Sequence, residues 1–168
     1  TDVEIKENQI SNLENEIFKS KIDYALATPY SDDLVDFISQ SKFDKLFKNY
    51  NILDNKEKFQ KVEFIKGSIL IINLKKFKNK DLFDENFFFF FEEIDLCRKV
   101  KSLEQNVYVL MFEKVIHFGS GSTSIEHQKY VNFRNWNYLW SSFYYNKKHY
   151  GFLFSFFKHL SKLFRYLI

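Results

Sequence analysis

A run of five phenylalanines that leads straight into acidic residues is the feature that most constrains the fold. Residues 86–99 read NFFFFFEEIDLCRK, so the aromatic run is followed at once by Glu92, Glu93 and Asp95. Burying aromatic rings is favourable, whereas burying unpaired carboxylates beside them is costly. This stretch therefore predicts either a helix with one solvated face or acid groups at the wall of a cavity.

The composition is that of a folded domain with a substantial core. The 168 residues are 45% hydrophobic and 20% aromatic, which suits one globular domain or a large piece of one. One proline and four glycines exclude collagen-like and linker-like chains. The single cysteine, Cys97, excludes an internal disulfide framework and favours a reducing compartment. No signal peptide and no apolar run of about 18 residues is found, so we expect a cytoplasmic protein.

Charge is divided unevenly along the chain. The net charge is +3, but residues 127–168 carry seven Lys or Arg and no Asp or Glu. Residues 1–126 hold the other 18 basic residues against 22 acidic ones. Such a division predicts that the C-terminal end meets an anionic surface.

Residues 1–118 alternate between helical and extended patterns, which predicts an α/β layered domain. A helix over 9–20 has an apolar stripe of Ile10, Leu13, Ile17 and Phe18, and a second helix is expected over about 91–104. Strands are expected in IDYALATP, ending at Pro29, and in 107–111 and 114–118. Residues 62–73 predict two strands, or one strand broken at Gly67.

The remaining segments predict loops and helix starts. Residues 31–33, Ser-Asp-Asp, can cap a helix to about residue 39, and 41–60 are expected to be mostly loop. Thr123 and Glu126 have capping-box spacing before a helix. That helix has aromatic residues along one side, namely Tyr130, Phe133, Trp136, Trp140 and Tyr144.

The acidic cluster has two interpretations. In the first, the carboxylates of Glu92 and Asp95 lie in the first turn of a helix, where they oppose the positive end of its dipole, and Asp95 pairs with Lys99. The pattern by itself favours this interpretation, because acidic first turns are common. In the second, one carboxylate is a general base whose proton affinity is raised by the neighbouring phenylalanines.

His117 is a second candidate for chemistry. It ends an apolar strand just before the loop GSGSTS, where its side chain can project from a sheet edge. A single histidine is more often a hydrogen-bonded core or surface residue than a metal ligand, so both roles stay open. Gly119 and Gly121 are too few for a phosphate-binding fingerprint.

The order of five segments resembles the second half of a bacterial family-2 glycosyltransferase. They are TDV, FIKGSILIIN, FDENFFFFFEEIDLCRKV, VYVLMFEKVIHFGSGST and YVNFRN. The resemblance extends to about Asn135 and implies the GT-A fold, a Rossmann-like α/β sheet, without its N-terminal nucleotide-binding strands. Residues 1–128 would be the C-terminal part of that domain, and 129–168 a basic aromatic helical tail. Such a piece is expected to be inactive by itself and to expose a sheet edge.

The resemblance also implies site residues. Glu93 stands at the position of the catalytic base, where most relatives have aspartate, and Glu92 and Asp95 would help to hold the acceptor and the helix start. Asp2 and His117 would bind Mn²⁺ or Mg²⁺, and Gly67 and Ser68 would lie near donor sugar or acceptor. The phenylalanines would pack against the sheet.

The implied activity is metal-dependent transfer of a sugar, with inversion, from a nucleotide-diphosphate donor. The acceptor would be a hydroxyl of a cell-surface glycan or of a lipid-linked glycan. A degenerate member of the family that has lost its chemistry is less expected, because Asp2, Glu93 and His117 are all present.

The C-terminal segment leaves other functions open. Residues 152–168 have apolar residues at helical spacing and Lys158, Lys162 and Arg165 opposite. Such a helix can lie on an anionic membrane, here the inner face of the cell membrane, or pack on its own domain. The alternative to an enzyme is a non-catalytic module that binds membrane or nucleic acid through the whole basic aromatic tail, residues 129–168. Its regular apolar face argues against nucleic acid.

Overall fold

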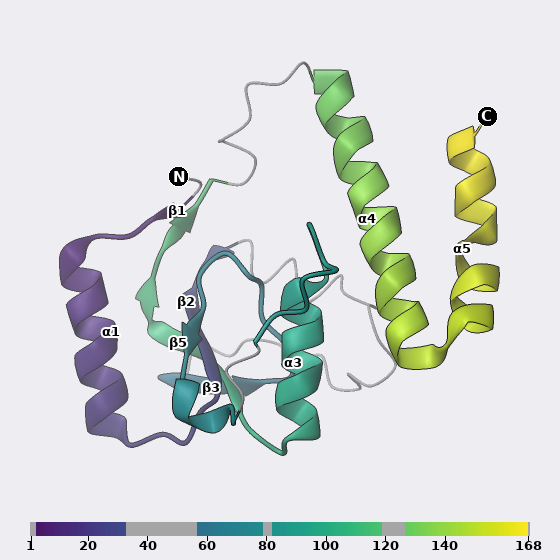
Figure 1. The fold of residues 1–168 in the computed structure, drawn as a ribbon. Helices are drawn as coiled ribbons and strands as arrows, with labels where there is room; N and C mark the ends of the chain where they lie inside the picture. Colours follow the sequence, from purple (N-terminus) through teal and green to yellow (C-terminus); the bar gives the residue numbers. More distant parts are fainter. Residues whose placement is uncertain (1–2, 33–56, 79–81, 119–126, 168) are drawn as a thin grey trace. The chain divides into compact units, whose positions relative to one another are not determined.

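The structure is a computed structural model that describes residues 3–32, 57–78, 82–118 and 127–167 (Figure 1). These ranges contain six strands, β1 (Val3–Glu4), β2 (Leu26–Tyr30), β3 (Phe59–Val62), β4 (Ile71–Ile72), β5 (Val107–Lys114) and β6 (Ile116–His117). Their helices are α1 (Glu7–Ser20), η1 (Leu74–Lys76), α3 (Glu92–Ser102), α4 (His127–Tyr150) and α5 (Phe152–Leu167). They form two compact units, Thr1–Leu82 with Leu96–Ser122, and Phe83–Asp95 with Thr123–Ile168. Residues 83–95, which the sequence-based division assigned to the N-terminal part, thus group with α4 and α5.

The first unit is a mixed α/β structure. Its four-stranded sheet has the order β3-β5-β2-β4, in which β2 and β5 are parallel and the two edge strands run antiparallel to their neighbours. β1 and β6 form a separate antiparallel pair. The expected α/β class is therefore confirmed at this level.

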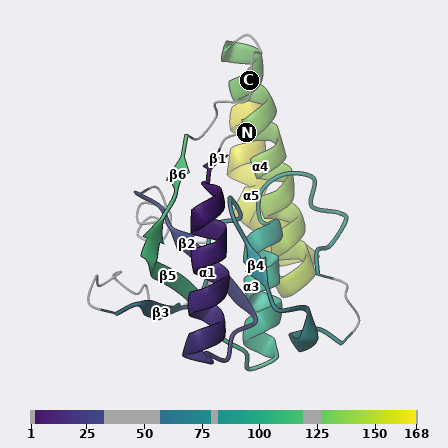
Figure 2. The same cartoon turned by 90° about the vertical axis from the view of Figure 1, so that its left-hand side faces the viewer.

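Helix α1 covers one face of this sheet (Figure 2). The predicted helix is confirmed, and Leu13 of its apolar stripe is buried against Ala27 of β2 and Leu110 of β5. Gln9 and Asn12 donate hydrogen bonds of 2.8 and 2.6 Å to the carboxylate of Glu113 on β5. The rest of the stripe is less buried than expected, since Ile10 and Phe18 are 45% and 86% exposed.

The strand predictions need three corrections. β2 continues to Tyr30, one residue beyond its expected end at Pro29; Pro29 pairs with Leu110 of β5, and the register shifts only between Pro29 and Tyr30. Among the described residues β4 pairs with β2 only at Leu26 and Ala27. Pro29 has no backbone N–H to donate, but it lies beyond this pairing and therefore interrupts no hydrogen bond to β4. Residues 62–73 do not form one strand, because β3 and β4 lie at opposite edges of the sheet. β3 also takes Phe59 and Gln60 from the expected loop.

The second unit contains an antiparallel helical hairpin, α4 and α5, which lie side by side in Figure 1. Both helices were predicted, and the turn between them is Gly151, with φ +90°. The capping box at Thr123 and the helix expected after Ser31 fall on residues outside the described ranges.

The phenylalanine run packs on α4. Phe87 and Phe91 are buried, whereas Phe88 and Phe89 are 74% and 41% exposed. Their ring contacts join the run to four aromatic side chains of α4, namely Phe133, Tyr138, Tyr144 and Tyr145. Within the second unit the run thus packs on a helix that the motif does not contain, and the expected packing against the sheet stays a prediction.

Candidate functional site

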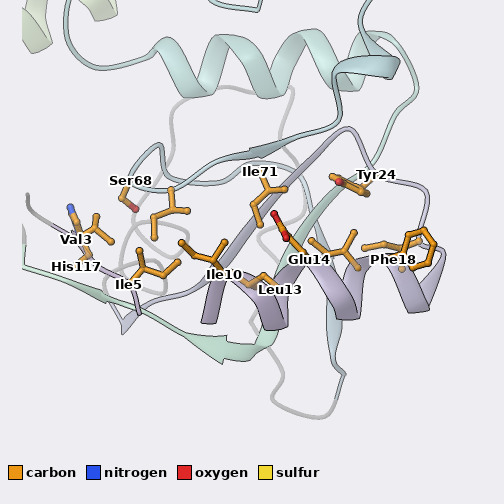
Figure 3. A pocket seen from close by; sticks show the side chains of 13 residues that line it. Val3, Ile5, Ile10, Leu13, Glu14, Phe18, Tyr24, Ser68, Ile71 and His117 are labelled. Atoms are coloured by element: carbon orange, nitrogen blue, oxygen red, sulfur yellow. The ribbon is translucent and has the colours of Figure 1, made fainter. Parts of the chain in front are cut away.

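The first unit has a large apolar pocket of about 1230 Å³. Helix α1, the two short strands β1 and β6, and the segment around β4 supply its walls (Figure 3). Most of the side chains that line it are aliphatic or aromatic, and its acidic and basic members are Glu14 and His117. Pockets of this kind, with a few convergent polar groups, are the usual form of small-molecule sites.

One end of the pocket brings together three segments that are far apart in sequence. Val3 and His117 face each other across the β1–β6 pair, and Ser68 lies beside them (Figure 3). The ammonium nitrogen of Lys66 lies 3.4 Å from Nδ1 of His117. Two of the residues predicted for the site, Ser68 and His117, are therefore lining the same end of one pocket. Gly67 is the exposed neighbour of Ser68 in the chain.

The expected metal site stays a prediction. Asp2 lies outside the described residues and precedes Val3 by one peptide bond. Within the described ranges, no group of three His, Cys, Asp or Glu side chains is placed to hold a metal ion. His117 supplies an imidazole, which together with a carboxylate suits Mn²⁺. The donor types fit such an ion, and the structure describes one of the two expected ligands.

The acidic cluster forms the first turn of α3, as predicted from the pattern. Glu92 and Glu93 are half-buried there, and their carboxylates lie at the positive end of the helix dipole. No described residue donates a hydrogen bond to the buried oxygen Oε2 of Glu92. A buried acceptor in this state is costly unless a ligand or water completes it.

The backbone in front of this turn is strained. Phe90 and Phe91 both have φ +70°, a left-handed conformation that costs a non-glycine residue roughly 1–2 kcal/mol. The buried ring of Phe91 packs on Tyr138 and Tyr145, which holds the chain in this conformation. Strain of this kind clusters at functional sites, and here it immediately precedes the first turn of α3.

Asp95 is engaged by α4. Its two oxygens accept hydrogen bonds from Lys148 Nζ at 2.7 Å and His149 Nε2 at 2.6 Å. Lys148 also contacts Asp84 at 2.8 Å, and Tyr144 donates to the same carboxylate at 2.9 Å. The helical spacing predicted Lys99 as the partner of Asp95, and no local pattern indicates the network with α4.

The network changes the acidity of its carboxyl groups. Burial by itself raises the pKa of Asp95, but the hydrogen bonds and charges of His149 and Lys148 outweigh it and lower the pKa below its ordinary value. Burial likewise opposes hydrogen bonds from Lys148, Asn86 and Tyr144 at Asp84, and the net pKa is again lowered. Both carboxylates are therefore ionised at neutral pH.

The structure adds residues that sequence reasoning missed. Lys66 directly precedes Gly67 in FIKGS, but its proximity to His117 joins residues 51 positions apart and has no local signal. Tyr144, Lys148 and His149 carry no local signal, since their acidic partners lie more than 50 residues earlier in the chain.

Fold and pocket together define a mixed α/β protein with an apolar pocket that is polar at one end. Comparison with models of known protein families, with curated proteins and with solved structures found no match. Among the helices of the described ranges, none has the length and apolar character to cross a membrane.

Proposed function

We propose that the protein is an inverting, metal-dependent glycosyltransferase of family 2 with a GT-A fold. The motif order in the sequence suggests this class, and one structural observation supports it. The antiparallel pairing of β1 with β6 puts Val3, the residue after Asp2, opposite His117, with Ser68 lining the same pocket end. Three segments that the resemblance assigns to one site thus come together in the first unit.

The polar end of the pocket would receive the diphosphate of a nucleotide-sugar donor. His117 and Asp2 would hold Mn²⁺ or Mg²⁺, which would neutralise the leaving diphosphate. Lys66, beside His117, would add a positive charge for the same phosphates. Gly67 and Ser68 would lie near the donor sugar.

Glu93 would act as the general base. It would take the proton of the acceptor hydroxyl while the hydroxyl oxygen bonds to the anomeric carbon and the bond to the diphosphate breaks. A single displacement of this kind inverts the anomeric configuration and needs no nucleophilic residue of the protein. The buried Oε2 of Glu92 would accept a hydrogen bond from the acceptor, a glycan or lipid-linked glycan. Asp95, already bound by Lys148 and His149, would fix the start of the helix.

The test is sugar transfer by the full gene product, with Glu93→Gln as the central variant. We expect transfer to fall about 100- to 10 000-fold, the usual contribution of a general base. Binding of the donor, measured by calorimetry with Mn²⁺ present, should be unchanged, because Gln keeps the shape of the side chain. Glu104→Gln, an exposed position past the end of α3, is the matched control and should transfer at the normal rate.

The metal ligands give a separate prediction, which is measured as donor binding by calorimetry. His117→Ala should weaken donor binding, and chelation of the metal with EDTA should weaken it to the same level. Normal transfer by Glu93→Gln would remove Glu93 from the mechanism. Donor binding that neither EDTA nor His117→Ala weakens would contradict the proposed metal site.

A further inference from the structure

Helix α5 turns its apolar side outward. Leu153 and Phe157 are 69% and 68% exposed, and Phe152 and Phe156 are exposed as well. The residues buried against α4 are small or polar instead. Ser155 donates a 2.7 Å hydrogen bond to the carbonyl of Phe143, and His159 Nε2 lies 2.9 Å from Ser142 Oγ. An amphipathic helix normally buries its apolar side, so this hairpin is built with that side left for another surface.

The exposed apolar surface continues onto α4. Trp136 and Trp140 are 58% and 53% exposed, and the rings follow one another from one helix to the next. Trp140 stacks on Phe143 at 6.5 Å, Phe143 meets Phe152 at 6.2 Å, and Phe152 stacks on Phe156 at 5.9 Å. We call the exposed members the apolar face; they are Trp136, Trp140, Phe152, Leu153, Phe156 and Phe157.

Lysines flank the two tryptophans along α4. Lys129, Trp136, Trp140 and Lys147 follow one another at intervals of seven, four and seven residues, which places all four on one side of the helix. All four are exposed. Tryptophan with adjacent lysine is the combination that favours the headgroup region of a bilayer.

We propose that the apolar face binds to the surface of an anionic lipid bilayer, with the hairpin lying in the interface. Residues 127–168 have seven basic and no acidic residues, so attraction to anionic headgroups adds to the burial of the aromatic side chains. A second copy of the hairpin is a poorer partner, because it would bring the same positive charges together. Nucleic acid is poorer too, since the face has contiguous apolar side chains rather than a basic groove.

The chain offers a direct probe, because its two tryptophans both belong to the apolar face. Vesicles of phosphatidylglycerol and phosphatidylcholine should shift the tryptophan emission to shorter wavelength, and brominated lipid should quench it. Vesicles of phosphatidylcholine alone should do so more weakly, and added salt should weaken binding to the anionic vesicles.

The double variant Leu153→Ser and Phe157→Ser removes two exposed side chains of the apolar face. We expect it to reduce partitioning into the anionic vesicles about tenfold or more, since each lost side chain is worth at least that factor when fully buried. Phe18→Ser is the matched control, because Phe18 is 86% exposed but lies on α1 of the first unit. It should partition as the unchanged chain does.

Three results would overturn the proposal. The first is emission that brominated lipid does not quench in anionic vesicles. The second is a shift that grows with protein concentration without lipid, which would indicate self-association through this face. The third is a shift produced by single-stranded RNA in place of vesicles. None of these readouts depends on sugar transfer, so this proposal and the proposed enzyme activity stand or fall separately.

Discussion

At the scale of single residues, Lys148 links charged and aromatic groups of the second unit. Its ammonium group contacts Asp84 and Asp95, and it lies 5.5 Å from the centre of the Phe87 ring. Burial by itself lowers the pKa of Lys148, but the hydrogen bonds of the two carboxylates outweigh this and raise the pKa. One α4 side chain thus forms ion pairs with two carboxylates that lie close to the phenylalanines in sequence.

Lys148→Met should lower the free energy of unfolding of the second unit by about 1–3 kcal/mol at neutral pH, because two carboxylates lose a charged partner. Both Asp pKa values are lowered on folding, so their contribution is present above the ordinary value of 3.8 and is lost as the pH falls below it. The difference between Lys148→Met and the unchanged chain should therefore shrink in acid. Urea unfolding followed by tryptophan emission at neutral and acidic pH measures this.

Lys147→Met is the control for that experiment. Lys147 is the exposed neighbour of Lys148, and its loss should change the free energy of unfolding by less than about 0.5 kcal/mol. Equal effects of the two variants, or a difference that persists unchanged in acid, would contradict the role given to Lys148.

At the scale of secondary-structure elements, the α4–α5 hairpin depends on its turn. The N–H of Gly151 donates to the Lys147 carbonyl at 3.1 Å, and the Ser155 N–H donates to the Gly151 carbonyl at 3.2 Å. Gly151 therefore ends α4 and starts α5 within one residue. Its φ of +90° is the conformation that glycine adopts at helix ends without steric cost.

Gly151→Ala should destabilise the hairpin by about 1–2 kcal/mol. A Cβ at this position would meet no atom within 4 Å, so the cost is the backbone conformation rather than a clash. Gly151→Asn should cost less, because asparagine tolerates the left-handed region better than alanine. Thermal unfolding followed by tryptophan emission gives the order of stability of the three chains. An alanine variant as stable as the unchanged chain would show that residue 151 does not have a positive φ.

At the scale of the whole molecule, the two units have different kinds of core. The first unit buries aliphatic side chains between α1 and the sheet. The second relies on aromatic contacts and on polar groups such as Asn146 and His159, which are almost fully buried. Both tryptophans of the chain lie in the second unit, so fluorescence reports on one unit and circular dichroism on both.

Leu13→Ala should lower the stability of the first unit by about 2–4 kcal/mol, because it leaves a cavity in a core where Leu13 is 3% exposed. The unfolding curve from circular dichroism should shift to lower urea, while the curve from tryptophan emission should move much less. Curves that shift together would mean that the two units unfold as one cooperative structure.

Local patterns predicted most of the secondary structure. The helices expected over 9–20, 91–104 and 152–168 are confirmed as α1, α3 and α5, because apolar periodicity and helix starts are properties of neighbouring residues. The candidate site was less predictable. His117 and Ser68 were named from motif order, but their shared pocket depends on tertiary contacts between segments far apart in the chain.

The sequence by itself determined the periodicities, the charge division and the candidate acidic turn, since each is a property of residues close together in the chain. Tertiary structure alone decided the partners: Asp95 with Lys148 and His149, the phenylalanines with α4, and Val3 with His117. It also decided that the apolar side of α5 faces outward. Burial and pairing free energies depend on which distant segments meet, and composition does not carry that information.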